Sequence, residues 1–152
     1  MDAKPQPVPA PSTAPAQPAP APLARRLLTP LVTLAGVAAA FTYVGTVDPN
    51  EPGHYPACPL LQLTDIYCPG CGGLRSAHGV ATGDLVGAFG ANAMAVVGYA
   101  VCAVLWAVWM VRSARGLPMR INVKPVFWWS LGAVAAIFSI VRNLPFGSVL
   151  AP

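Results

Sequence analysis

The chain has 152 residues, of which 55% are hydrophobic and 9% are charged, and its formal net charge is +4. Soluble domains carry about 25% charged residues, so this composition excludes an ordinary soluble domain and indicates a chain that faces lipid. The basic residues flank apolar runs and do not form a patch with interleaved aromatic side chains, so we expect no nucleic-acid partner.

Residues 1–24 form a segment rich in proline and alanine, with eight prolines among the first 22 residues. A segment of this kind has little apolar surface to bury and few side chains that favour helix or strand. It therefore predicts an extended, disordered tail. The rest of the chain, residues 25–152, is expected to be a helical membrane domain.

Three apolar runs follow the tail. The length of each run is close to the number of residues, about 20, that a helix needs to cross a ~30 Å hydrocarbon core. They predict membrane-spanning helices over about 27–47, 91–111 and 125–143. Pro30 falls in the first turn of the first predicted span, where a missing N–H is tolerated. Asp84 supplies a cap at which the helix of the second span is expected to begin.

The first apolar run has an alternative reading as a cleavable signal peptide, because it contains the small residues of "GVAAAF". Its length and the long tail before it favour a retained span.

The charge distribution predicts how the spans are oriented. Seven of the nine Lys and Arg residues fall on one side of a three-span arrangement. They are Lys4, Arg25, Arg26, Arg112, Arg115, Arg120 and Lys124. The positive-inside rule makes that side cytoplasmic. The N-terminus is then cytoplasmic, whereas the loop of residues 48–90 and the C-terminus are extracytoplasmic.

Three of the four cysteines, Cys58, Cys68 and Cys71, lie in this outer loop. Covalent haem attachment is excluded, because it requires histidine directly after the Cys-x-x-Cys pair and glycine follows here. With one of the candidates His54 and His78, of which His78 is preferred, the three cysteines would make the four ligands of a zinc site, although the loop has no second Cys-x-x-Cys pair. The fourth cysteine, Cys102, lies in the middle of the second span and is expected to be a buried structural residue.

The sequence after Cys68 also predicts a short interfacial helix. Pro69 favours the first helical position, which makes Cys68 the N-terminal cap and places Cys68, Cys71, Arg75 and His78 on one helical face. A thiolate at a helix N-terminus beside an arginine is stabilised. A redox pair would therefore use Cys68 as nucleophile, Cys71 as resolving thiol and Arg75 as activating group.

Several chemistries remain open for this cluster. A disulfide from Cys58 to Cys68 or Cys71 would stabilise the loop by about 3 kcal/mol and leave one odd thiol. A structural disulfide, a metal site, a thiol-disulfide oxidoreductase and a cluster without special chemistry are the alternatives, in that order of preference. This order favours a binding or assembly module over an enzyme.

A second group of polar residues flanks the spans on the outer side. Its members are Asp84, Asn92, Arg142 and Asn143. Polar groups that meet within a membrane bundle mark its functional region, so we expect them to lie near the cysteines.

These elements resemble a family of small bacterial membrane proteins classed as a domain of unknown function. Its signature is similar to Cys-Pro, a spacer, Cys-Pro-Gly-Cys-Gly, a following Arg, Gly-Asp, Asn, and a late Arg-Asn. The matching positions are Cys58, Pro59, Cys68, Pro69, Gly70, Cys71, Gly72, Arg75, Gly83, Asp84, Asn92, Arg142 and Asn143. The resemblance departs at Leu74 and Ala93, where the family has Thr and Pro. It implies an architecture but no activity.

The sequence thus predicts an all-α membrane protein with about three transmembrane helices, a short interfacial helix and a disordered proline-rich tail. We expect it in a bacterial cytoplasmic membrane, in contact with the lipid bilayer and with a membrane-protein partner or a second copy. The cofactor is left open, and zinc is the ion that the cysteines would hold if they bind a metal.

Overall fold

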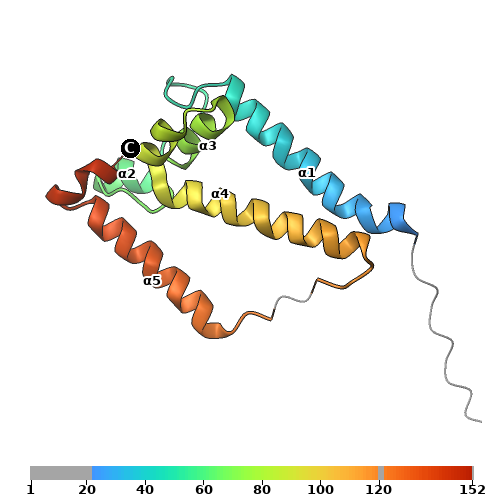
Figure 1. Cartoon of the computed structure of the whole chain (residues 1–152). Coiled ribbons are helices and arrows are strands. Elements are labelled where there is room, and N and C mark those ends of the chain that lie inside the picture. The colour runs from blue at the N-terminus through green and yellow to red at the C-terminus, as the bar shows by residue number, and fades with distance from the viewer. Residues whose placement is uncertain (1–21, 120–121, 152) are drawn as a thin grey trace, which may run out of the picture.

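The computed structural model describes residues 22–119 and 122–151 (Figure 1). Every regular element within these residues is a helix, which confirms the predicted all-α fold. The elements are α1 (Leu23–Thr46), α2 (Pro59–Thr64), α3 (Gly73–Thr82), α4 (Leu85–Ala114), α5 (Pro125–Arg142) and the 3-10 helix η1 (Pro145–Leu150). Residues 1–21 of the predicted tail lie outside the described residues.

Three of these helices are long and apolar enough to cross a membrane. They are α1, α4 and α5, with 24, 30 and 18 residues. Few of their side chains are buried within the protein, because a helix that spans a bilayer buries its apolar surface in lipid. The chain is therefore a multi-pass membrane protein, as its composition predicted.

The helix α1 begins earlier than the sequence predicted. It starts at Leu23, so Pro30 lies about two turns inside the helix and not in its first turn. Pro30 is buried, and its carbonyl accepts a hydrogen bond from the indole N–H of Trp106 at 3.0 Å. This contact joins α1 to α4 at the position of the proline.

The helix α4 begins where the sequence predicted but is broken after two turns. The Asp84 carboxylate accepts a hydrogen bond from the N–H of Gly87 at 2.9 Å and caps the helix. Asn92 then has an extended backbone, with φ −163° and ψ 94°. Its side-chain oxygen accepts the N–H of Ala95 at 2.9 Å, so it caps the second part of the helix.

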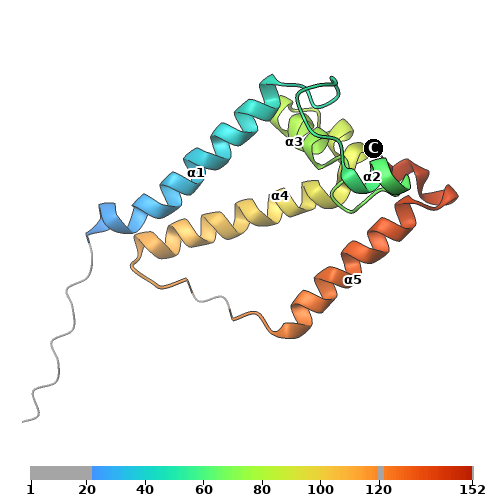
Figure 2. The ribbon, with the colours of Figure 1, turned by 180° about the vertical axis from the view of Figure 1, so that it is seen from behind.

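The helices α1 and α4 run antiparallel, and α3 lies between them where α1 ends and α4 begins (Figures 1 and 2). We call this end of the molecule the cysteine end. Phe41 of α1 meets Tyr99 of α4 edge to face, with ring centroids 5.5 Å apart. These contacts make α1, α3 and α4 one packed unit.

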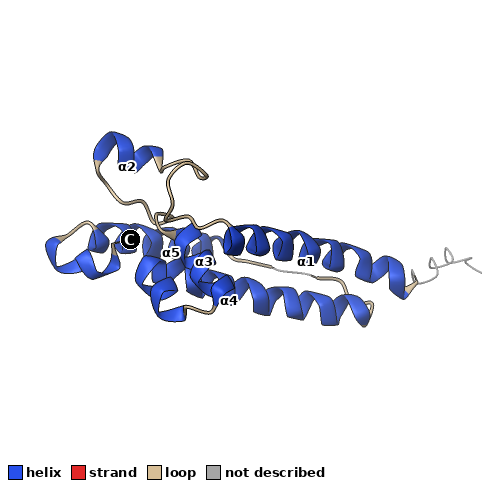
Figure 3. Ribbon diagram, turned by 90° about the horizontal axis from the view of Figure 1, so that it is seen from above, coloured by secondary structure: helices blue, strands red, loops and turns tan. Residues whose placement is uncertain are grey.

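The helix α5 belongs to this unit only at the cysteine end. It packs along neither α1 nor α4 and diverges from α4 toward its own N-terminus (Figure 1). Its C-terminal residues meet the segment that precedes α3. The short helix α2 stands apart from α1, α3 and α4, as the view from above shows (Figure 3).

Candidate functional site

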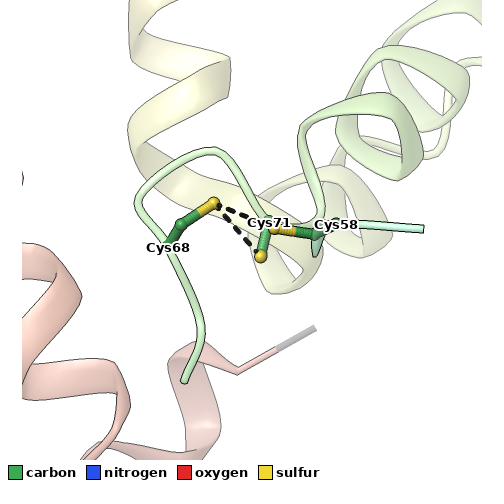
Figure 4. Close-up of side chains that lie close together, drawn as sticks. All are labelled: Cys58, Cys68 and Cys71. Atoms are coloured by element: carbon green, nitrogen blue, oxygen red, sulfur yellow. Dashed lines mark hydrogen bonds between the residues drawn. The ribbon is translucent and has the colours of Figure 1, made fainter. Parts of the chain in front are cut away.

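Three cysteines from the segment between α1 and α3 meet at the cysteine end (Figure 4). The sulfur atoms of Cys58 and Cys68 are 3.7 Å apart, and those of Cys68 and Cys71 are 3.2 Å apart. All three sulfur atoms lie within 4.8 Å of one another. Cys71 is buried, whereas Cys58 and Cys68 are half-buried.

Two consecutive turns set the positions of Cys68 and Cys71. The N–H of Cys71 bonds to the carbonyl of Cys68 at 3.1 Å around Pro69 and Gly70. Gly72 then has φ 80°, a left-handed conformation that favours glycine, and it caps α3. We call residues 68–72 the cysteine turn.

The prediction that Cys68 caps the interfacial helix is therefore wrong. The helix α3 begins at Gly73, because the left-handed backbone of Gly72 cannot continue a right-handed helix toward its N-terminus. Cys68 and Cys71 lie before the helix, so they do not share a helical face with Arg75 and His78.

The structure places His78 and Arg75 away from the sulfur atoms. The Nδ1 of His78 lies 2.8 Å from the carbonyl oxygen of Val44 and ties α3 to α1. Arg75 is exposed and, with His78 and Asp84, lines a separate hollow of about 540 Å³. Among the described residues, the group of side chains able to share a metal ion therefore contains the three cysteines and not His78.

Two buried side chains from the spanning helices support the cysteine turn. The side-chain N–H groups of Asn92 donate to the carbonyls of Pro69 and Cys71, both at 2.9 Å. The Nη1 of Arg142 donates to the carbonyls of Cys68 and Cys71, at 3.1 and 3.0 Å. Asn92 and Arg142 are each 1% exposed, so these contacts form in the interior.

The residue before the turn is held in the same way by α5. The side chain of Asn143 accepts the N–H of Tyr67 and donates to its carbonyl, both at 2.8 Å. The hydroxyl of Ser139 donates to the same carbonyl at 2.9 Å. The conformation of the cysteine-bearing segment is thus specified by residues more than 70 positions later in the chain.

Some of these supporting residues were missed in the sequence. Ser139 lies three residues before Arg142 and shares its helical face. This spacing could have identified Ser139 as a second supporting residue from α5. Ser76 bonds to the carbonyls of Ala88 and Asn92 where α4 is broken, and Tyr99 bonds to the carbonyl of Gly73. Their roles depend on the break in α4, which a hydrophobic pattern does not reveal.

The environments of the cysteines differ in their effect on the thiol pKa. The backbone N–H of Leu61 stabilises the thiolate of Cys58 and lowers its pKa. Burial raises the pKa of Cys71 to about 12, with a further contribution from its hydrogen bond to Cys68. The cluster therefore combines a thiol whose pKa is lowered, Cys58, with a buried thiol that keeps its proton at neutral pH, Cys71.

The arrangement has the donor set of a thiophilic metal site. A tetrahedral ion with metal–sulfur bonds of about 2.3 Å separates its sulfur ligands by about 3.8 Å. The Cys58–Cys68 separation of 3.7 Å matches this value, and the Cys68–Cys71 separation of 3.2 Å requires a small side-chain rotation. The three cysteines can hold a metal ion such as Zn²⁺ and leave its fourth position for another ligand.

Comparison with known proteins gives one family model that matches part of the chain, and it gives no activity. No curated protein and no solved structure gives a significant match to the chain. A family model does match it, from the first cysteine of the cluster into α4, and ends before Arg142 and Asn143. Residues 58–106 of the chain match the family described as a protein of unknown function (DUF2752).

Proposed function

We propose that this protein binds one thiophilic divalent metal ion, with Zn²⁺ as the preferred ion, through the thiolates of Cys58, Cys68 and Cys71. The observation that carries the proposal is the approach of three sulfur atoms to within 4.8 Å of one another. The sulfur atoms come from two separate segments, and the backbone of Cys68 and Cys71 is fixed by contacts from α4 and α5. Preorganised ligands lower the entropic cost of binding an ion.

The bound ion would act as a cross-link within the outer segment. It joins Cys58, which precedes α2, to the cysteine turn, and so restricts where α2 lies. The helix α2 and the residues after it expose Leu60, Leu63 and Ile66, and Leu63 is 84% exposed. An apolar surface whose position is fixed by a bound metal ion can bind another membrane protein, as an assembly module would.

The direct test is a count of metal ions and free thiols in the full chain, purified in detergent with and without reductant. We expect one ion per chain, lost when Cys58, Cys68 or Cys71 is replaced by serine. The matched control is Cys102→Ser, because Cys102 lies in α4 away from the cluster and should leave the ion in place. A protein that carries no ion and takes none up from solution would contradict the proposal.

A second function is favoured by one observation, the 3.2 Å separation between the sulfur atoms of Cys68 and Cys71. These residues can form a disulfide that gains two electrons and two protons from a dithiol substrate, as in a thiol-disulfide oxidoreductase. The thiol count separates the two functions, since an oxidised pair lacks two free thiols until reductant is added. A fully reduced protein with a stoichiometric metal ion excludes this second function.

A further inference from the structure

The neighbours of Arg142 within the protein satisfy only some of the hydrogen-bond donors of its buried guanidinium and provide no opposite charge. Nη1 has two carbonyl partners, whereas Nε and Nη2 are buried and have none. Among the described residues, no carboxylate forms an ion pair with it. A buried charge without an opposite charge is costly, and at the edge of a bilayer the cost increases.

Two aromatic rings reduce this cost only in part. The guanidinium carbon lies 5.0 Å from the ring centre of Phe138 and 5.7 Å from that of Tyr67. Such contacts stabilise a desolvated cation by about 2 kcal/mol. They do not neutralise its charge, and they provide no acceptor for the two free donors.

The groups that do interact with this charge are the cysteines themselves. Both carbonyls that Nη1 contacts belong to Cys68 and Cys71, so the guanidinium lies against the backbone of two of the three cluster cysteines. A protonated thiol or a disulfide carries no charge. Only a deprotonated cluster would supply the negative charge that the site around Arg142 lacks.

We infer that Arg142 is the counter-cation of an anionic metal–thiolate complex formed by Cys58, Cys68 and Cys71. This inference rests on the proposed function. When an ion binds, the three thiols lose three protons to solvent. A divalent ion with three thiolates has one net negative charge, which Arg142 neutralises. A monovalent ion such as Cu⁺ with the same ligands has two net negative charges, and its attraction to Arg142 is about twice as large.

This difference between ions separates an electrostatic role from a structural one. If Arg142 only held the cysteine turn in shape, its replacement would weaken the binding of every ion by the same factor. If its charge matters, loss of the charge weakens the monovalent complex more. A roughly ten-fold loss for a divalent ion then corresponds to a roughly hundred-fold loss for a monovalent one, because the free energy is doubled.

The experiment measures Cd²⁺ and Cu⁺ affinities of the full chain in detergent, by competition with chelators of known affinity under anaerobic, reducing conditions. Arg142→Gln removes the charge and retains side-chain N–H donors. Arg142→Lys retains the charge and removes the planar fork that contacts two carbonyls. Asn143→Ala is the matched control, because it disturbs the neighbouring backbone at Tyr67 without changing charge.

We expect Arg142→Gln to weaken Cu⁺ binding at least ten-fold more than Cd²⁺ binding. Arg142→Lys and Asn143→Ala should keep the wild-type ratio of the two affinities, even if both affinities fall. Equal losses for the two ions in Arg142→Gln would overturn the inference while leaving the metal site intact. If Arg142→Gln does not fold, a changed ratio in Arg142→Lys would overturn it. A wild-type chain that binds neither ion would reject the proposed function as well.

Discussion

At the scale of single residues, Asn92 connects the membrane helix α4 to the cysteine turn. Its side-chain N–H groups bond to the carbonyls of Pro69 and Cys71, and its side-chain oxygen caps the second part of α4. One buried side chain thus bonds to three backbone groups, and it shares the carbonyl of Cys71 with Arg142. We expect Asn92 to matter for both stability and site geometry.

Replacing Asn92 by alanine should lower the free energy of unfolding by about 2–3 kcal/mol, because it removes the cap and the hydrogen bonds to the carbonyls of Pro69 and Cys71. Asn92→Asp retains an acceptor for the cap but loses the donors, so it separates the two contributions. The measurement is thermal unfolding in detergent. As a control, Thr42→Ala removes an exposed hydroxyl contact within α1 and should have little effect. A loss for Asn92→Ala as small as that of Thr42→Ala would contradict this role.

The cysteines should differ in reactivity in the reduced, metal-free protein. A thiol reacts as its thiolate, and the lowered pKa of Cys58 gives it more thiolate at a given pH than Cys71, whose pKa is about 12. Alkylation of Cys58 should therefore be faster at pH 7–9, and the rate at Cys71 should still be rising at pH 10. Mass spectrometry of the alkylated peptides measures both rates.

The control for this reactivity is the same reaction in denaturant, where the two thiols should react at similar rates because the folded environment is lost. A folded protein in which Cys71 is alkylated before Cys58 at pH 8 would contradict the assigned environments.

The residues of the site were predictable from the sequence to different extents. Cys58, Cys68 and Cys71 lie in one loop between apolar runs, so the predicted spans already placed the three cysteines together on one side of the membrane. Asn92 and Arg142 lie at the boundaries of those runs, and both contact the cysteine turn in the structure. The geometry assigned to His78 failed, since it assumed a continuous helix through Gly72, where the backbone is left-handed. Nothing in a residue pattern fixes that local conformation.

At the scale of elements, the close contact between α3 and α4 depends on Gly79. A Cβ atom at this position would lie 2.8 Å from the carbonyl oxygen of Asp84 and 2.9 Å from the Cβ of Ala88. Both neighbours are held by helix backbone and cannot move without separating the helices. The glycine therefore sets the distance between the helix that follows the cysteine turn and the helix that supports it.

Gly79→Ala should destabilise the protein by about 1–3 kcal/mol, because the added methyl group overpacks this contact. Gly98→Ala is the matched control. It lies in α4 with no atom within 4 Å of the added Cβ, so it should be neutral or stabilising by up to about 1 kcal/mol. Thermal unfolding of both variants in one detergent tests the difference. Equal effects of the two substitutions would contradict the packing argument.

The membrane-spanning helices were the most predictable elements, because their length and composition are set by the bilayer. Hydropathy located all three, and the cap at Asp84 located the start of α4. The start of α1 was less predictable, since Arg25 and Arg26 interrupt the apolar pattern but continue the helix. A charged side chain ends an apolar run without ending a helix.

At the scale of the whole molecule, the cysteine end and the opposite end of the helices carry different residues. The C-terminal ends of α1 and α5 and the start of α4 lie at the cysteine end, and the basic residues Arg25, Arg26, Arg112 and Arg115 lie toward the opposite end (Figure 1). The positive-inside rule favours an extracytoplasmic cysteine end. In that orientation the cluster would lie in a compartment without the cytosolic thiol reductants, where disulfides can form and persist.

This orientation predicts the behaviour of reporter fusions in bacterial cells. Alkaline phosphatase, which folds only outside the cytoplasm, should be active when fused after Leu150 and inactive when fused after Arg115. Both fusions follow complete helices, so each serves as the control of the other. The reverse pattern of activity would place the cysteine end in the cytoplasm and contradict the proposed orientation.

X-ray absorption spectroscopy of the zinc-loaded protein shows directly whether the three cysteine thiolates bind one metal ion. We expect three sulfur ligands at about 2.3 Å and one nitrogen or oxygen ligand at about 2.0–2.2 Å. Cys58→Ser should no longer give a zinc-loaded site with three sulfur ligands, whereas Cys102→Ser should leave the count at three. A spectrum with one sulfur ligand or none, or a count unchanged by Cys58→Ser, would contradict the proposed metal site.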